Sequence, residues 1–379
     1  MLYENDANKH GRLRKLAGEA MTPVAVAAAL PSFQELANQQ IDRVLKEGTI
    51  QMEEVCNDFT LDVAWKQILG LDLKEEDVPK FRRMVKTWTN CIMDPTLLVP
   101  FRIPGLLTLT KTGRARTYIV SKIDEKLDAL ERDGPDSSTL SKLFFAKDDE
   151  GNKLTREEVI HNAMLLIFAG SETSSSTLTC ASLLLGLHPN VFRKVKAEQE
   201  KIVAEVGEDF TRESLEMSIY LDSVIKETLR IKPIEFGETR MVISTVVVDG
   251  KQLPKNWLAM FNIKQTHWND PTTFMEDGSH MDVRKGFQPE RWLDDSTKPS
   301  EWLPFGEGRR RCLGERLGMA EMKVFLGMMA RKVDRYKLVN VNGDDNIVWK
   351  TNTVMARPKD GTEIRAVAAD TSRVIEYQI

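Results

Sequence analysis

Apolar residues recur at helical spacing through most of the first 230 positions. Phe33, Leu36, Ile41 and Val44 share one face of a helix that this spacing predicts over 31–46. Further helices are predicted over 50–70, 76–92, 113–133, 155–187, 190–206, 217–231 and 313–333. We therefore expect a helical body, and the sequence holds no internal repeat that would divide it.

From residue 233 the pattern favours short strands. The β-branched run 241–248 ends at Asp249-Gly250, a dipeptide typical of a two-residue hairpin. The segment 265–311 lacks periodicity and is expected to be an irregular, packed loop. Other strands are predicted over 252–254, 257–263, 336–341, 347–355 and 363–368. The expected fold is mainly α with a minor β part, in a single domain 1–379 that is helix-rich over 1–232 and β-rich or irregular over 233–379.

Composition and charge exclude several classes of protein. The 53 Lys and Arg residues nearly balance the 57 Asp and Glu residues, which argues against a nucleic-acid binder that works by bulk charge. The four cysteines are too few and too scattered for a disulfide scaffold or a paired-cysteine metal site. The longest apolar runs, 24–30 and 164–170, are too short to span a bilayer, and the first residues do not predict a signal peptide.

The helix predicted over 155–187 is long and has a polar centre. It opens with a capping box in which Thr155 and Glu158 satisfy each other's backbone groups. Residues 170–177 are a glycine followed by polar residues, poor helix formers that can bend a helix. One interpretation is an exposed turn or a break between two helices. The other is a groove in a buried helix, where Glu172 and Thr173 would place an acid and an alcohol beside a ligand.

The segment 305–316 is the most specific in the chain. Cys312 precedes a predicted helix, whose N-terminus stabilises a thiolate. Glycines at 306, 308 and 314 permit tight turns and the close approach of a flat ligand. Phe305 can pack against such a ligand and Arg310 can bind an anionic group on it. The alternative is a structural cysteine in a basic loop, which is our interpretation for the cysteines at 56, 91 and 180.

The pattern Phe305-x-x-Gly308-x-Arg310-x-Cys312-x-Gly314 resembles the haem-binding signature of the cytochrome P450 haem-thiolate monooxygenases. The resemblance implies the cytochrome P450 fold, with haem b as cofactor and the Cys312 thiolate as the axial ligand of its iron. The other four residues of the pattern would then surround the haem.

Three further motifs resemble the family in the same order along the chain. The run 169–174 is similar to its oxygen-activation motif, which implies that Ala169 and Gly170 line the haem and that Glu172 and Thr173 deliver protons. The family's Glu-x-x-Arg and Arg-bearing motifs are matched at 227–230 and 289–292. By resemblance, these two motifs supply a structural ion network formed by Glu227, Arg230 and Arg291.

Haem carries two propionates, so cations should converge on it. The resemblance offers Arg310 and Arg240 for this role. His10 and Arg14, four residues apart, fall where family members carry further propionate contacts. The alternative for this last pair is a solvated basic helix.

The resemblance implies hydroxylation of an apolar substrate with O2 and two electrons, drawn from NADPH through a cytochrome P450 reductase or a ferredoxin. Stretches at 254–257, 266–270 and 358–361 are similar to the branch with retinoic-acid hydroxylases and plant steroid and terpenoid oxidases. An isoprenoid, sterol or retinoid-like substrate follows, with contacts expected at Ile234, Phe236 and Val354. Arg309 and Arg311 form either a docking face for the redox partner or an ordinary solvated charge run.

The resemblance begins late in the family's pattern. Its membrane anchor, first helices and first strands have no counterpart in the chain, so we expect an N-terminally truncated member. By resemblance, the full-length protein would meet the endoplasmic reticulum or plastid membrane through the missing part. Two alternatives to a monooxygenase stay open: a haem-thiolate isomerase or dehydratase, and a truncated, non-catalytic haem protein.

Overall fold

The computed structural model describes residues 4, 6–90, 106–235, 237–271, 274, 278–279, 286–341, 347–350 and 355–369. The helices are α1 (Ala7–Gly18), α2 (Pro23–Glu47), α3 (Met52–Val63), α4 (Val78–Thr89), α5 (Leu106–Leu109), α6 (Lys111–Asp133), α7 (Thr139–Phe145), α8 (Arg156–Leu187), α9 (Pro189–Val206), α10 (Arg212–Met217), α11 (Ile219–Ile231), α12 (Ile263–Asn269) and α13 (Glu315–Lys332). The strands are β1 (Thr49–Gln51), β2 (Glu238–Met241), β3 (Val246–Val248), β4 (Lys251–Leu253), β5 (Leu258–Phe261), β6 (Val333–Leu338) and β7 (Glu363–Ala368).

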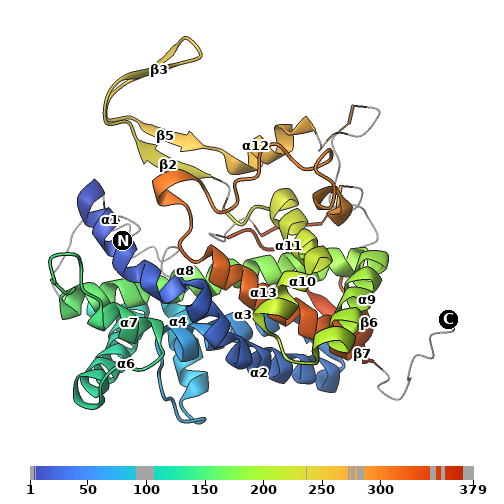
Figure 1. The fold of residues 1–379 in the computed structure, drawn as a ribbon, viewed down its shortest axis with the longest axis horizontal. Coiled ribbons are helices and arrows are strands. Elements are labelled where there is room, and N and C mark those ends of the chain that lie inside the picture. Colours follow the sequence, from blue (N-terminus) through green and yellow to red (C-terminus); the bar gives the residue numbers. More distant parts are fainter. Residues whose placement is uncertain are drawn as a thin grey trace.

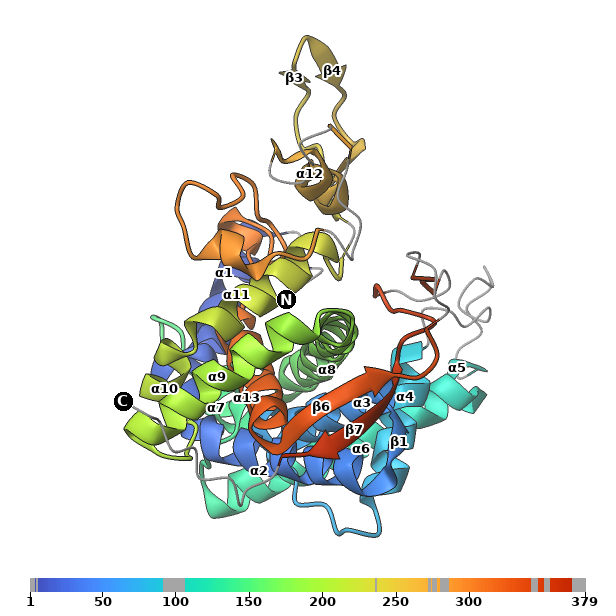
Figure 2. The same cartoon turned by 90° about the vertical axis from the view of Figure 1, so that its right-hand side faces the viewer.

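The helical body and the small β part follow the sequence-based expectation. In Figure 1 the long α8 crosses the body, with α13 and α3 packed against it and α2 packed against α13 and α3, while β2, β5 and β3 project from the helices. Figure 2 shows β6, β7 and β1 as a separate sheet on one side of the body, in the order β1-β7-β6. The mainly α fold with a minor β part is confirmed.

Most predicted helices are found within a few residues of their expected bounds, but the helix expected from Pro31 begins earlier. The Thr22 hydroxyl accepts a hydrogen bond from the Ala25 N–H, so Thr22 is the N-cap and Pro23 occupies the first turn. Pro31 therefore lies inside α2 instead of opening it. The prediction failed because a proline both starts helices and is tolerated within them at an exposed position.

The β region is divided differently from the prediction. The expected strand over 241–248 is broken, because β2 pairs with β5 in one sheet and β3 pairs with β4 in another. The predicted hairpin turn is confirmed: Asp249 and Gly250 have φ of 48° and 72°. Two successive positive φ angles match the strongly twisted two-residue turn for which Asp-Gly is selected.

Three other boundaries also differ. The segment expected to be irregular from 265 opens with α12, which the Asn262 side chain caps by accepting the Gln265 N–H. Strand β6 starts at Val333, three residues early, because the chain passes from α13 directly into the strand. Of the described residues in the strand predicted over 347–355, only Trp349 makes a bridge, to Pro358.

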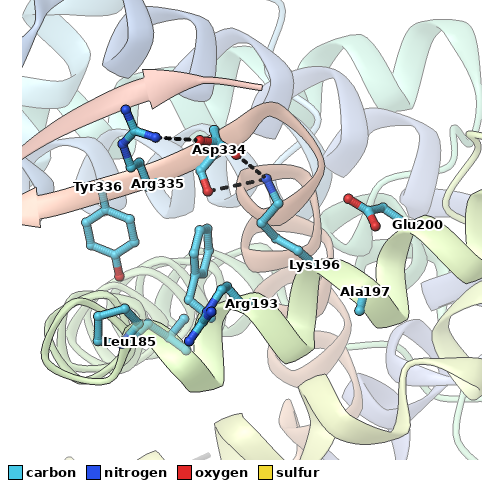
Figure 3. A pocket seen from close by; sticks show the side chains of 10 residues that line it. Leu185, Arg193, Lys196, Ala197, Glu200, Asp334, Arg335 and Tyr336 are labelled. Atoms are coloured by element: carbon cyan, nitrogen blue, oxygen red, sulfur yellow. Dashed lines mark hydrogen bonds and ion pairs between the residues drawn. The ribbon is translucent and has the colours of Figure 1, made fainter. Parts of the chain in front are cut away.

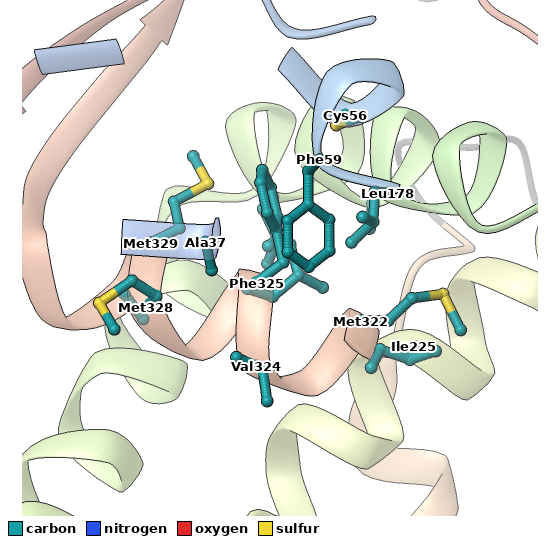
Figure 4. Packing of buried hydrophobic residues seen from close by; sticks show 14 of the residues in the cluster. Ala37, Cys56, Phe59, Leu178, Ile225, Met322, Val324, Phe325, Met328 and Met329 are labelled. Atoms are coloured by element: carbon teal, nitrogen blue, oxygen red, sulfur yellow. The ribbon is translucent and has the colours of Figure 1, made fainter. Parts of the chain in front are cut away.

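The core forms two hydrophobic clusters that both include residues of α8. One gathers side chains from α2, α3, α8, α11 and α13, and Figure 4 shows part of it around Phe59 and Phe325. These two rings lie 4.8 Å apart, centroid to centroid, and neither is exposed. The other cluster joins α1, α4, α6 and α7 to the first half of α8. Dense packing on both sides fixes α8 in place.

Helix α8 is continuous over 32 residues, so its polar centre is neither an exposed turn nor a break. The capping box of Thr155 and Glu158 is present as predicted. The hydroxyls of Ser171, Thr173 and Thr177 donate back to carbonyls four residues earlier, as Ser171 does to Ile167 at 2.7 Å. These bonds satisfy polar groups in a segment that the core would otherwise exclude.

No single helix among the described residues is long and apolar enough to cross a membrane. One bent pair, Ala7–Met21 with Pro23–Glu47, meets that test by length and composition only.

Glu321 of α13 is fully enclosed against α8. Burial raises its pKa to about 8, against which a hydrogen bond from Ser174 works only in part. The folded protein thus keeps a proton on Glu321 at pH values above 4.5, the ordinary pKa of a glutamate, where the unfolded chain has released it. Unfolding then releases a proton, so stability is retained at low pH and lost as pH rises from about 4.5 to about 8.

We expect Glu321→Gln to flatten this dependence, because the amide stays neutral at every pH. At pH 8 the variant should be more stable than the wild type by up to a few kcal/mol, since each pKa unit is worth about 1.4 kcal/mol. Melting temperatures at pH 5 and pH 8 measure the effect. The control is Glu205→Gln, whose carboxylate lies at the surface beside Lys201. An equal change in melting temperature between pH 5 and pH 8 for wild type and Glu321→Gln would contradict the expectation.

Candidate functional site around Cys312

The loop before α13 has a tightly bonded backbone. The Cys312 N–H donates to the Phe305 carbonyl at 2.8 Å, and the Gly306 N–H donates to the Leu303 carbonyl at 3.0 Å. Gly306 and Gly308 have φ of 65° and 68°, which favour glycine. A Cβ on Gly306 would also lie 2.1 Å from Oε1 of Glu238. The glycines singled out in the sequence thus shape the turn that presents Cys312.

The Cys312 thiol is exposed, unlike the buried thiols of Cys56 and Cys180. Burial by the surrounding protein still raises its pKa, opposed by the Gly314 N–H, which donates to the sulfur, and by the Arg14 charge. The thiol is therefore accessible to solvent although protein surrounds it on several sides, so a ligand can reach the sulfur.

Glu227 is completely buried and accepts hydrogen bonds from both predicted arginines. Nε and Nη2 of Arg230 donate to its two oxygens at 2.9 and 2.8 Å, and Nε of Arg291 donates at 3.0 Å. The backbone N–H of Gln288 and the indole N–H of Trp292 complete its shell, at 3.0 and 2.9 Å. The structure thus joins α11 to the turn 289–292.

His267 links this network to the cysteine loop, and the sequence analysis did not single it out. Its Nδ1 lies 3.2 Å from the Arg230 carbonyl, and its Nε2 accepts the Leu303 N–H at 2.9 Å. Because Nε2 accepts, the neutral ring carries its proton on Nδ1 and donates to Arg230. Burial lowers the pKa of His267 to about 4, so it stays neutral. The one available signal was a histidine within the family-like stretch 266–270.

The oxygen-activation motif lies on the one partly exposed face of this part of α8. Ala169, Glu172 and Thr173 are partly exposed, whereas most residues of the following two turns are buried. The Thr173 hydroxyl donates to the Ala169 carbonyl at 2.6 Å. A Cβ on Gly170 would lie 3.1 Å from the Ile68 side chain, so the missing side chain makes room for Ile68, and the expected place of Gly170 beside the haem stays a prediction.

Basic groups gather near the sulfur. Burial, together with the charges of Arg310 and Arg14, lowers the pKa of His10, so the three side chains are neighbours. Nη2 of Arg310 donates to the Glu4 carbonyl at 2.7 Å. Arg14 has no ion pair with any residue that the structure describes. Arg240 differs in being paired with Glu238.

The predicted substrate contacts are only partly described. Phe236 and Val354 lie outside the described residues, as does Cys91. Ile234 is 7% exposed and belongs to the core, so its side chain packs against the protein and not along an open wall. Its neighbour Glu235 is exposed, close enough to Cys312 that its charge affects the thiol.

These features fit a haem. The donor set is a single accessible thiol, since no group of three or more His, Cys, Asp or Glu residues among the described positions could hold a bare metal ion. The charge of Arg14, which has no ion pair with any described residue, acts on this thiol, and haem propionates call for such a cation. The open face of α8 supplies small and polar side chains. Cys312 would hold the iron, and Arg14, Arg310 and His10 would receive the propionates.

A surface pocket of about 490 Å³ lies elsewhere, between α8, α9 and β6 (Figure 3). Its lining mixes Tyr336 and Phe192 with the ion pair of Lys196 and Asp334. None of the predicted site residues lines it, so we do not assign it to the site around Cys312.

Comparisons with known proteins agree with the geometry. The family model described as Cytochrome P450 matches residues 1–359. Cytochrome P450 120 of Synechocystis sp. is 27% identical over 94% of this chain and 76% of its own length. Beta-amyrin 11-oxidase of Glycyrrhiza uralensis is 26% identical over 79% of this chain and 59% of its own length. The solved structure of retinoic acid bound cyanobacterial CYP120A1 is similar with a TM-score of 0.80 and 27% identity, over 95% of this chain and 79% of that one.

The chain belongs to the cytochrome P450 family. It is therefore an enzyme of the monooxygenase kind, and the resemblance seen in its sequence motifs is confirmed at the level of family and fold.

We expect Glu227→Ala to lower the free energy of unfolding by about 3–5 kcal/mol, because Arg230 and Arg291 would lose the anion that compensates them. Urea unfolding measures the change. The matched control is Glu290→Ala, in the same turn as Arg291. Glu290 pairs with Lys194 at the surface, so its loss should cost less than about 1 kcal/mol. Equal losses in the two variants would contradict a central role for Glu227.

Proposed function

We propose that the protein hydroxylates a C–H bond of an apolar isoprenoid, sterol or retinoid-like substrate, with haem bound through Cys312. The observation that carries the proposal is the exposed Cys312 thiol just before α13, which feels the charge of Arg14, a cation that has no ion pair with any residue the structure describes. Haem, when bound, supplies the activation of O2 and the electron transfer. The protein residues bind, orient and protonate around it.

The residues around Cys312 and those on the partly exposed face of α8 each have a separate role. The Gly314 N–H and the Arg14 charge stabilise the Cys312 thiolate that would hold the iron. Thr173 donates its own proton to Ala169, which leaves its oxygen free to accept a hydrogen bond from water or a reacting group. Glu172, next to it on the same partly exposed face, is the acid that exchanges protons with solvent.

The substrate class is supported by the names of two similar proteins, which mention β-amyrin and retinoic acid. The charges near Cys312 favour some substrates of this class over others. Glu235 is exposed and its charge acts on Cys312, whereas Glu238 is paired with Arg240. An unpaired carboxylate repels a substrate carboxylate, so we propose a neutral isoprenoid or sterol ahead of a retinoid acid.

Electrons are proposed to come from NADPH through a cytochrome P450 reductase or a ferredoxin. The exposed Arg309 and Arg311 lie on the thiolate side, where an acidic partner would dock. Arg311 shares its charge with Glu315, at 2.7 Å, so Arg309 is the stronger docking residue of the two. The isomerase or dehydratase alternative is weaker, because it does not need the acid–alcohol pair on α8 that this chain retains.

The direct test is the visible spectrum of the dithionite-reduced chain with carbon monoxide. We expect a strongly red-shifted Soret band, because the Cys312 thiolate would hold the haem iron. Cys312→Ser should lose the band, and Cys56→Ala should keep it, since burial raises the pKa of Cys56 to about 12 and the residue belongs to the core. A haem protein without the red-shifted band, or a band that persists in Cys312→Ser, would exclude thiolate ligation by this residue.

Thr173→Val should reduce the fraction of consumed NADPH recovered as hydroxylated product by about tenfold or more, because a positioned proton-transfer group is lost. The matched control is Thr177→Val. Thr177 makes the same type of bond one turn later, to the Thr173 carbonyl at 3.0 Å, but is buried. The substrate is a neutral terpenoid that perturbs the haem spectrum, and both hydroxylated product and hydrogen peroxide are measured. Equal recovery in both variants would remove Thr173 from the mechanism.

A further inference from the structure

Arg357 is a buried arginine that contacts the acid of α8. Its Nη2 donates to Oε2 of Glu172 at 2.5 Å, and its Nη1 donates to Oε1 of Glu53 at 3.0 Å. The Arg357 side chain is 9% exposed. Building on the function proposed above, we propose that Arg357 is a positioning residue: it anchors one oxygen of Glu172 and so holds the other on the partly exposed face of α8 for proton delivery.

The geometry of Glu172 supports an anchored acid. Oε2 is engaged by Arg357, whereas no hydrogen bond to Oε1 comes from the part of the chain that the structure describes. The side chain keeps 22% of its surface exposed. A carboxylate held at one oxygen and open at the other has a fixed direction and free access to water. Fixed orientation is what a proton-transfer group needs, since misplacement by about 1 Å can cost about a hundredfold in rate.

Arg357 is itself held from several sides. Glu53 of α3 also accepts Lys350 Nζ at 2.6 Å. Burial acts to raise the pKa of Glu53, but the hydrogen bonds from Lys350 and Arg357 outweigh burial, so the pKa of Glu53 is lowered. Two carboxylates thus face two cations, so the cluster of Glu53, Lys350, Arg357 and Glu172 is electrically neutral. The arginine cannot leave Glu172 without stranding charge in a poorly solvated place.

The backbone around Arg357 adds a second restraint. The Arg357 carbonyl accepts the Lys350 N–H at 2.9 Å, and the preceding Ala356 N–H donates to the Ile234 carbonyl at 3.2 Å. Asn57 of α3 lies within 3.4 Å of Nη2 of Arg357 and accepts the Ser175 hydroxyl of α8 at 2.6 Å. Segments remote in sequence therefore converge on one side chain, which fixes it relative to α8.

The proposal predicts a specific defect. Hydroxylation consumes one O2, two electrons and two protons, and yields the alcohol and one water. When protons are misdelivered, the same two electrons and two protons leave with O2 as hydrogen peroxide. Loss of Arg357 should therefore shift products from alcohol to peroxide while haem binding is unchanged.

A first experiment asks whether the pair is energetically coupled and does not depend on activity. Melting temperatures are measured for wild type, Arg357→Gln, Glu172→Gln and the double variant. Arg357→Gln should lower the midpoint by about 2 °C or more. The melting temperature of the double variant should be well above the value that adding the two single decreases gives, because the contact between Arg357 and Glu172 is lost only once. Additive effects would overturn the pairing on which the proposal rests.

A second experiment measures product and peroxide per NADPH in haem-loaded Arg357→Gln, Arg357→Lys and the control Arg335→Gln. Arg335 is exposed, and among the described residues its guanidinium forms an ion pair only with its neighbour Asp334. We expect the product fraction to fall about tenfold in Arg357→Gln, to recover in part in Arg357→Lys, and to stay unchanged in Arg335→Gln. Arg357→Lys keeps the buried charge, so it also serves if Arg357→Gln fails to fold.

The outcomes separate this proposal from the proposed function. A wild type without the red-shifted carbon monoxide band contradicts the function, while the melting temperatures still decide the Glu172–Arg357 pairing. If all variants keep that band and the same product fraction, Arg357 does not position the acid. If the Arg357 variants lose the band together with product, the role of Arg357 is structural and the proposal is also overturned.

Discussion

The carboxylate of Glu227 is the constraint on which the site depends. A charge with no exposure is tolerated only when hydrogen bonds and opposite charges surround it, and here Arg230, Arg291 and Trp292 do so. Each partner comes from a different part of α11 or the turn 289–292. The bonds therefore fix these two segments relative to one another, and His267 extends the same rigid set to the loop that ends at Cys312.

Helix α8 imposes the complementary constraint from the other side. Its flanks are packed into two hydrophobic clusters, which hold its one partly exposed face in place. Local back-bonds satisfy the hydroxyls in this face, and Arg357 ties Glu172 to α3. The proton transfer proposed for Glu172 and Thr173 thus depends on rigid surroundings that hold these side chains in place.

Much of the fold was readable because its signals are local. Helical spacing predicted most helices, the Asp249-Gly250 turn specified its hairpin, and Thr155 with Glu158 marked the start of α8. The predictions of element boundaries failed where a boundary depends on residues outside the element, such as a pairing strand or a capping side chain. The strand expected over 241–248 is divided because its two ends pair with different strands, and Pro31 was taken as a start although Thr22 caps the same helix.

The sequence by itself determined the family and singled out Cys312 and the loop glycines, because those residues act within a turn or two of one another. Only the tertiary structure decided which groups meet across the chain. It buried Ile234, filled the space at Gly170 with Ile68, and brought His267 and Arg357 to their partners. The physical reason is that a buried polar group must find its partner wherever packing places one, and sequence separation does not limit that distance.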